Sequence, residues 1–190
     1  MENEKLIREM LIKIGENPDR EGLKGTPKRI VNMWKEIFRG YDIEQKPTIT
    51  TFKNGIDGIT YNQMVVDSGK FYSHCEHHMV PFFGKYWFAY IPHPKGKILG
   101  ISKVARVVDF CSAKLQIQER LVQDVVNMLW EKLSEGTAYK PQGMALIMKG
   151  THLCKSMRGV KKEGEMITSE MRGIFKTEDK VRNEFLQLIK

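Results

Sequence analysis

The order of extended and helical patterns after residue 60 constrains the fold of this chain more than any other feature. Four segments have the character of strands: residues 64–72, 83–91, 142–151 and 165–175. The first two are rich in Val, Phe, Tyr and Trp, as strands usually are. Two segments with apolar residues at helical spacing, residues 102–115 and 119–133, lie between the second strand and the third. This order predicts an α+β domain with two helices on one face of a sheet.

The N-terminal third has a different pattern. Residues 2–14 carry apolar side chains at helical spacing, and a second helix is predicted from Thr26, as N-cap, with Pro27 at its first position. Residues 46–61 contain Thr, Gly, Asp and Asn, which is typical of a short strand and a loop. We therefore predict a helical arm and linker over residues 1–60 and a separate α+β domain over residues 61–190.

Composition limits the compartment and the partners. The three cysteines, Cys75, Cys111 and Cys154, are an odd number without disulfide spacing, which indicates a reducing, cytoplasmic location. No apolar run approaches the roughly 20 residues of a membrane helix, and the charged N-terminus is unlike a secretory signal. The formal net charge of +8 favours an anionic partner, but it leaves nucleic acid, phosphorylated metabolites and anionic surfaces open.

Metal-binding residue types are densest at residues 74–78, which read His-Cys-Glu-His-His. A turn can aim Cys75 and His78, three residues apart, at one ion, and Cys154 is a third candidate ligand. Two sulfurs and one nitrogen suit zinc, and three protein ligands leave the open position typical of a catalytic site. Two alternatives stay open: a structural zinc site with His74 or His77 as fourth ligand, and surface histidines with core cysteines.

Two further histidines lie next to these candidate ligands. His77 precedes one, and His152 would face the same site as Cys154 if residues 151–154 were extended. An imidazole has an ordinary pKa of about 6.5, which suits proton transfer at neutral pH. The simpler alternative is that these histidines only support the ligands.

Two other groups of residues suit a nucleotide. Gly100 and Ser102 at a predicted helix start, with Lys103 and Arg106 on one helix face and Arg158 elsewhere, could hold a triphosphate. On these residues alone, a capped helix with solvated charges is the simpler explanation. Gln118 and Glu119 lie between the two predicted helices, where a carboxylate could accept from the N–H and amino groups of guanine. Here the alternative is a glutamate that caps a helix.

Several segments of the chain resemble, in order, motifs of the GTP cyclohydrolase I family. They are residues 71–78 (FYSHCEHH), 80–85 (VPFFGK), 99–106 (LGISKVAR), 115–121 (LQIQERL), 152–154 (HLC), 157–160 (MRGV) and 168–175 (TSEMRGIF). In the N-terminal arm, residues 19–23 (DREGL) and 26–29 (TPKR) also fit. The resemblance covers nearly the whole chain.

This resemblance implies the tunnelling fold, in which a four-stranded antiparallel sheet is backed by two helices and preceded by a helical arm. It also implies a homodecamer of two pentamers with sites between subunits. The implied reaction is zinc-dependent hydrolytic ring opening of GTP, with loss of formate and rearrangement to 7,8-dihydroneopterin triphosphate, the first step of pterin and folate synthesis. No nucleic-acid or membrane partner is implied.

The resemblance also assigns roles to individual residues. The implied zinc ligands are Cys75, His78 and Cys154, and the implied catalytic residues are His77 and His152. The implied guanine contacts are Gln118 and Glu119, and the implied phosphate contacts are Ser102, Lys103, Arg106 and Arg158. Residues 155–156 (Lys-Ser) are more polar, and residues 111–114 less bulky and less basic, than the family's usual pattern, which puts local packing and affinity in question.

The sequence is also compatible with two rival functions. One is a tunnelling-fold relative that acts on another pterin or a deazapurine, against which the retained Cys, His and Glu positions argue. The other is a basic nucleic-acid-binding protein with structural zinc, supported by the net charge of +8. Against the second, the Lys and Arg residues are spread along the chain and no zinc-finger spacing occurs.

Overall fold

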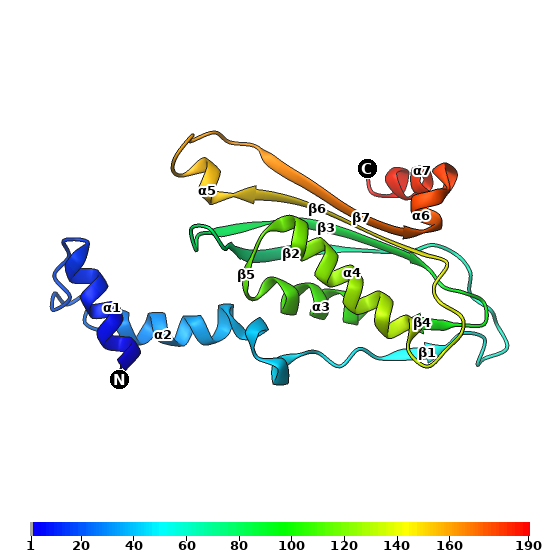
Figure 1. Ribbon diagram of the computed structural model, residues 1–190, viewed down its shortest axis with the longest axis horizontal. Helices are drawn as coiled ribbons and strands as arrows, with labels where there is room; N and C mark the ends of the chain where they lie inside the picture. Colours follow the sequence, from blue (N-terminus) through cyan, green and yellow to red (C-terminus); the bar gives the residue numbers. More distant parts are fainter. Residues whose placement is uncertain (1) are drawn as a thin grey trace.

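The computed structural model describes residues 2–190, and its centre is a five-stranded sheet (Figure 1). The strand order is β5-β2-β3-β6-β7. The four long strands are antiparallel: β2 (Val65–Cys75), β3 (Pro81–Ile91), β6 (Gly143–His152) and β7 (Glu165–Gly173). The short β5 (Leu115–Gln116) runs parallel to the end of β2, where His74 pairs with Leu115 and Cys75 with Gln116.

Two helices, α3 (Ser102–Ser112) and α4 (Gln118–Ser134), cover one face of this sheet. Side chains alternate along each strand, so every second residue points to the helices. The resulting core includes Phe71, Phe82, Phe88, Leu146 and Met148 from the strands, and Val104, Val107, Leu121, Val125 and Leu129 from the helices. Full burial of one such side chain contributes about 1.5–3 kcal/mol, so this layer fixes the ends of the strands and helices that carry the candidate site.

The opposite face of the sheet is covered only in part. The C-terminal helices α6 (Ile174–Thr177) and α7 (Asp179–Leu188) lie over one end of it (Figure 1). They form a second apolar cluster in which Phe175 and Phe185 pack on Ala89, Ile91 and Ala145. The C-terminal segment therefore stabilises the end of the sheet away from Cys75.

The N-terminal arm projects away from the sheet (Figure 1). Its helices α1 (Glu2–Lys13) and α2 (Thr26–Ile37) pack on each other, while Leu6, Met10 and Ile14 remain exposed. Two 3-10 turns, η1 (Arg39–Tyr41) and η2 (Ile43–Gln45), lead to β1 (Thr51–Lys53), which pairs antiparallel with β4 (Lys97–Leu99). This pair joins the linker to the second part of the chain, and the division at residue 60 stays a prediction.

The structure confirms the α+β class and the two helices on one sheet face. The predicted four-stranded sheet lacks β5, because a two-residue strand carries no periodicity. The predicted N-cap at Thr26 is wrong by one residue: the Thr26 backbone N–H already donates to Leu23 O at 2.9 Å, and Gly25 is the cap. Within residues 2–190, no helix has the length and apolar character needed to cross a membrane. The finer assignment to the tunnelling fold stays a prediction.

Candidate metal centre and nucleotide site

The turn between β2 and β3 presents the first two candidate ligands. Cys75 ends β2, and its backbone N–H donates to Val80 O at 2.9 Å, while the N–H of Met79 donates to Cys75 O at 2.8 Å. Met79 has a φ of 54°, in the left-handed region, which lets the chain reverse tightly before β3. This local structure brings His78 back beside Cys75, as the spacing predicts.

The third candidate ligand comes from the far end of β6. That strand pairs His152 with Phe82 of β3, and the chain then enters α5 (Leu153–Ser156). The condition that residues 151–154 are extended is therefore wrong, because the strand ends at His152. One helical turn instead carries Cys154 toward the β2–β3 turn, so His152 and Cys154 still lie in the same region of the protein.

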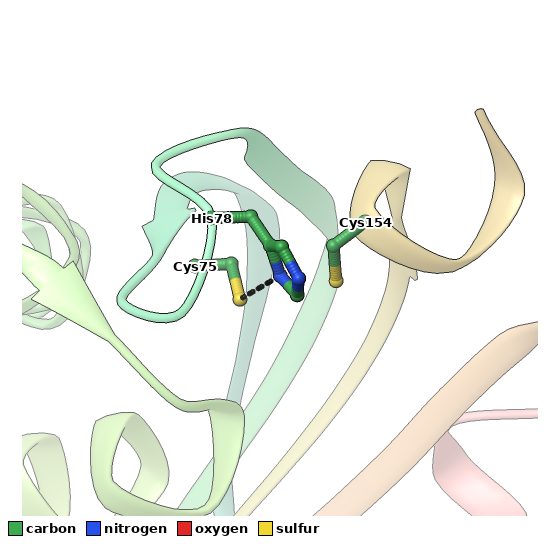
Figure 2. Close-up of side chains that lie close together, drawn as sticks. All are labelled: Cys75, His78 and Cys154. Carbon is green, nitrogen blue, oxygen red and sulfur yellow. Dashed lines mark hydrogen bonds between the residues drawn. The ribbon is translucent and has the colours of Figure 1, made fainter. Parts of the chain in front are cut away.

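The ligand atoms of Cys75, His78 and Cys154 all lie within 4.8 Å of one another (Figure 2). Cys75 Sγ is 4.0 Å from His78 Nδ1, and Figure 2 shows the imidazole between the two sulfur atoms. Tetrahedral zinc with Zn–S of about 2.3 Å and Zn–N of about 2.0–2.1 Å places its donor atoms roughly 3.5–3.8 Å apart. Burial, and then the neighbouring Cys75 thiol, raise the pKa of Cys154. A cation beside both sulfurs would favour their thiolates, so the donor set fits zinc.

The other two histidines of the motif differ in position. His77 is exposed, and its Nδ1 lies 3.7 Å from Cys75 Sγ, but the group of three ligands does not include it. His74 points elsewhere: its ring meets Phe38 edge-on at 5.4 Å, and burial lowers its pKa. His74 Nδ1 is buried without a hydrogen-bond partner among the described residues. In this geometry neither histidine completes a four-ligand structural site.

His152 is held on two sides. Its ring stacks on Phe82 with centroids 4.5 Å apart and planes 6° apart. Its Nε2 lies 2.9 Å from Oε1 of Gln118. Burial lowers the pKa of His152, and the negative charge of Glu119 acts in the opposite direction. A fixed imidazole with a nearby carboxylate is suited to transferring a proton.

Gln118 and Glu119 are neighbours in the chain but differ in environment. Gln118 is fully buried, and its Nε2 donates to Met148 O, Met166 O and Thr168 Oγ1 at 3.0–3.1 Å. Glu119 is exposed in the first turn of α4, where α4 has no side-chain cap. Glu119 is therefore available to a ligand, and the guanine contacts assigned to both residues stay predictions.

An ion pair connects the metal-binding turn to the same helix. Arg120 of α4 pairs with Glu76 and also donates through Nε to Gln116 Oε1 at 2.8 Å. The sequence motifs contain both Glu76 and Arg120, yet neither was predicted as a site residue, because a contact across 44 positions has no local signal. The stack of Phe82 on His152 was missed for the same reason.

The candidate phosphate residues are in two places. Arg158 lies at the metal centre, with its NH1 2.7 Å from His78 Nε2. The other candidates lie in the first half of α3: Ser102, Lys103 and Arg106. The opposite end of α3 is the one beside β2, because Ser73 Oγ donates a hydrogen bond to Ser112 O at 2.8 Å. An 11-residue helix is about 16 Å long, so Ser102 lies roughly one helix length from the metal end of the chain.

Comparisons of the chain with family models and with individual known proteins give the same family. The family model described as GTP cyclohydrolase I matches residues 3–190. The chain is 44% identical to GTP cyclohydrolase 1 of Caldanaerobacter subterraneus subsp. tengcongensis, over 97% of this chain and 94% of that relative. It is 44% identical to the Acetivibrio thermocellus protein of that name, over 96% and 93% of the two chains, and 40% identical to the one from Helicobacter pylori strain J99, over 98% and 99%.

A solved structure gives a much weaker likeness. It is titled as the archaeosine synthase QueF-Like in the apo form, and it aligns at 18% identity with a TM-score of 0.42. The alignment covers 56% of this chain and 92% of that one. A likeness of this size does not define the fold.

Proposed function

This chain belongs to the GTP cyclohydrolase I family, and on that premise we propose that it opens the guanine ring of GTP by zinc-dependent hydrolysis. Formate leaves, and rearrangement of the ribose with ring closure gives 7,8-dihydroneopterin triphosphate. The observation that carries the proposal is the meeting of the Cys75, His78 and Cys154 ligand atoms within 4.8 Å.

Cys75, His78 and Cys154 would hold the zinc ion. When bound with an open coordination position, zinc lowers the pKa of a coordinated water to about 7 and so supplies a nucleophile at neutral pH. The protein contributes the two thiolates and the imidazole from two separate elements, the β2–β3 turn and α5. Neither element alone provides three ligands, so the site forms only in the folded chain.

His152 and His77 would manage the protons. His152 protonates nitrogen 7 of the guanine, which makes carbon 8 electrophilic. Its stacking on Phe82 and its contact with Gln118 hold the ring in one plane, which limits the motion that would otherwise misalign the transfer. His77 is exposed beside Cys75 and would exchange protons with water or with the ribose.

Glu119 would select guanine, and the cationic residues would hold the triphosphate. The exposed carboxylate of Glu119 accepts from N1–H and from the amino group of guanine, a pair of donors that adenine lacks. The guanine contact expected of Gln118 is not part of this proposal, because its buried carboxamide is already hydrogen-bonded to Met148 O and Met166 O and lies against His152. Arg158 would contact the triphosphate next to the metal centre, together with Ser102, Lys103 and Arg106.

We further propose that these sites are shared between subunits of a homo-oligomer, with a decamer implied by the family. Two features support this. First, Ser102 lies about one helix length from the metal end of its own chain, so a neighbouring chain is better placed to contribute the phosphate residues. Second, β7 and most of β2 have no outer strand partner within residues 2–190, and the arm exposes Leu6, Met10 and Ile14. Open strand edges and exposed apolar side chains favour association.

The test is formate release and pterin fluorescence from purified protein and GTP, with and without a zinc chelator. We expect turnover that is lost on chelation and restored by added zinc. Zinc-loaded protein that binds GTP but releases no formate would contradict the proposed reaction. Parallel assays with other purine and pterin triphosphates would then identify the alternative substrate.

A further inference from the structure

We propose that Gln118 is a positioning residue that fixes the tautomer of His152, so that His152 exchanges its proton with the substrate through Nδ1. The inference deepens the proposed function, because it rests on His152 as the proton donor. It gives the buried carboxamide of Gln118 a role different from the predicted contact with guanine.

The carboxamide of Gln118 has only one orientation that its surroundings permit. Its Nε2 faces Met148 O, Met166 O and Thr168 Oγ1, all at 3.0–3.1 Å. Two of these neighbours are carbonyl oxygens, which can only accept hydrogen bonds. If the amide were rotated by half a turn, its own oxygen would face both carbonyls in a fully buried place, where unpaired acceptors are costly. The NH₂ group must therefore face β6 and β7.

This orientation determines where the Gln118 oxygen points. Oε1 lies 2.9 Å from Nε2 of His152 and can only accept, so Nε2 must carry a hydrogen. Gly150 provides the space for this contact, because a Cβ at that position would lie 2.5 Å from Gln118 Oε1. Any larger residue at position 150 would displace the oxygen from His152.

The other ring nitrogen of His152 is then the one that reacts. Nδ1 has no hydrogen-bond partner among residues 2–190, and it is not one of the buried unpartnered atoms. The protonated ring has hydrogens on both nitrogens, and it loses the one on Nδ1 to nitrogen 7 of guanine. The neutral ring that remains is the Nε2–H tautomer that Gln118 already stabilises. The transfer therefore requires no rearrangement of the ring or of the amide.

The experiment combines histidine NMR with kinetics on the zinc-loaded protein. In ¹⁵N-histidine-labelled protein, the His152 signals are assigned by their loss in His152→Asn. We expect neutral His152 to be present only as the Nε2–H tautomer, with a slowly exchanging Hε2 proton. Gln118→Met leaves that N–H facing an apolar side chain, so the Nδ1–H tautomer should become populated and the Hε2 signal should disappear. This variant should lower kcat for formate release at least tenfold, with KM for GTP within about threefold.

Thr168→Val is the matched control. It removes one partner of the Gln118 amide but keeps both carbonyl partners, so it should retain the wild-type tautomer and a kcat within about threefold. The wild-type spectrum tests the proposal without any variant: a neutral His152 with its hydrogen on Nδ1 would overturn it. In Gln118→Met, an unchanged His152 tautomer would also overturn the proposal. A changed preference of this variant for GTP over inosine triphosphate would overturn it as well, because that change would indicate that Gln118 contacts guanine. Absence of formate release by the wild type would refute the proposed function while leaving the tautomer result intact.

Discussion

Replacing Glu119 by glutamine tests how the protein recognises guanine. The substitution keeps the size of the side chain but removes its charge and one acceptor, and it places an NH₂ group against the amino group of the base. Glu119 is exposed, and its side chain makes no hydrogen bond or ion pair with another residue in the range 2–190, so the change disturbs little of the free protein. The consequences should therefore be confined to the ligand.

The magnitudes separate a guanine contact from a helix-capping role. Loss of a hydrogen bond to a charged group costs about 1.5–3 kcal/mol. At about 1.4 kcal/mol per factor of ten, the affinity for GTP should fall roughly 10- to 150-fold. If Glu119 acted only on the helix dipole of α4, its removal would cost about 0.3–1 kcal/mol of protein stability and would leave GTP affinity nearly unchanged.

The assay measures the affinity for GTP and for inosine triphosphate by titration, and the free energy of unfolding by denaturant. Inosine triphosphate lacks the amino group, so its binding should weaken less and the preference for GTP should shrink. Arg158→Ala is the control: it removes a triphosphate contact and should weaken both ligands by similar factors, more strongly at low salt. An unchanged GTP preference in Glu119→Gln would refute the guanine contact and leave Glu119 as a helix-terminal charge.

Three further predictions concern the metal, the thiols and the assembly. Elemental analysis should find one zinc per chain, and Cys154→Ala should lose most of it while Cys111→Ala retains it; full retention in Cys154→Ala would mean that the site is built otherwise. In metal-free protein at pH 8, a thiol reagent should modify Cys154 but not Cys111, which is 2% exposed and whose pKa burial raises to about 12, and rapid reaction of Cys111 would contradict this packing. Light scattering should show an oligomer, and a stable monomer that turns over GTP would exclude shared sites.

The parts of the fold that local sequence could predict are those with a strong period. The helices over residues 102–115 and 119–133, and the four long strands, all occur in the structure, with ends that coincide or shift by at most three residues. The short β5 was missed because two residues have no period, and its pairing with His74 and Cys75 depends on the position of β2. The sequence therefore predicted the layers, and tertiary contacts determined the ends of the elements.

The candidate metal centre was predictable for a different reason. Cys and His are chemically distinctive, so their types and the three-residue spacing of Cys75 and His78 indicated the site before any geometry was known. The contacts that orient the site could not be found in this way. Gln118 with His152, and Arg120 with Glu76, join residues 34 and 44 positions apart, and glutamine, glutamate and arginine are ordinary surface residues.

The first turn of α4 links these contacts. Residues 118, 119 and 120 are consecutive, so their side chains point about 100° apart around the helix and reach different targets. Gln118 holds His152, Glu119 faces solvent where a base could bind, and Arg120 holds Glu76 in the metal-binding turn. Because α4 is anchored by fully buried Leu121, Val125 and Leu129, it is a rigid support for all three. A shift of this turn would therefore move the proton donor, the guanine contact and the metal-binding turn together, so substitutions that displace it should affect metal affinity and nucleotide selectivity jointly rather than additively.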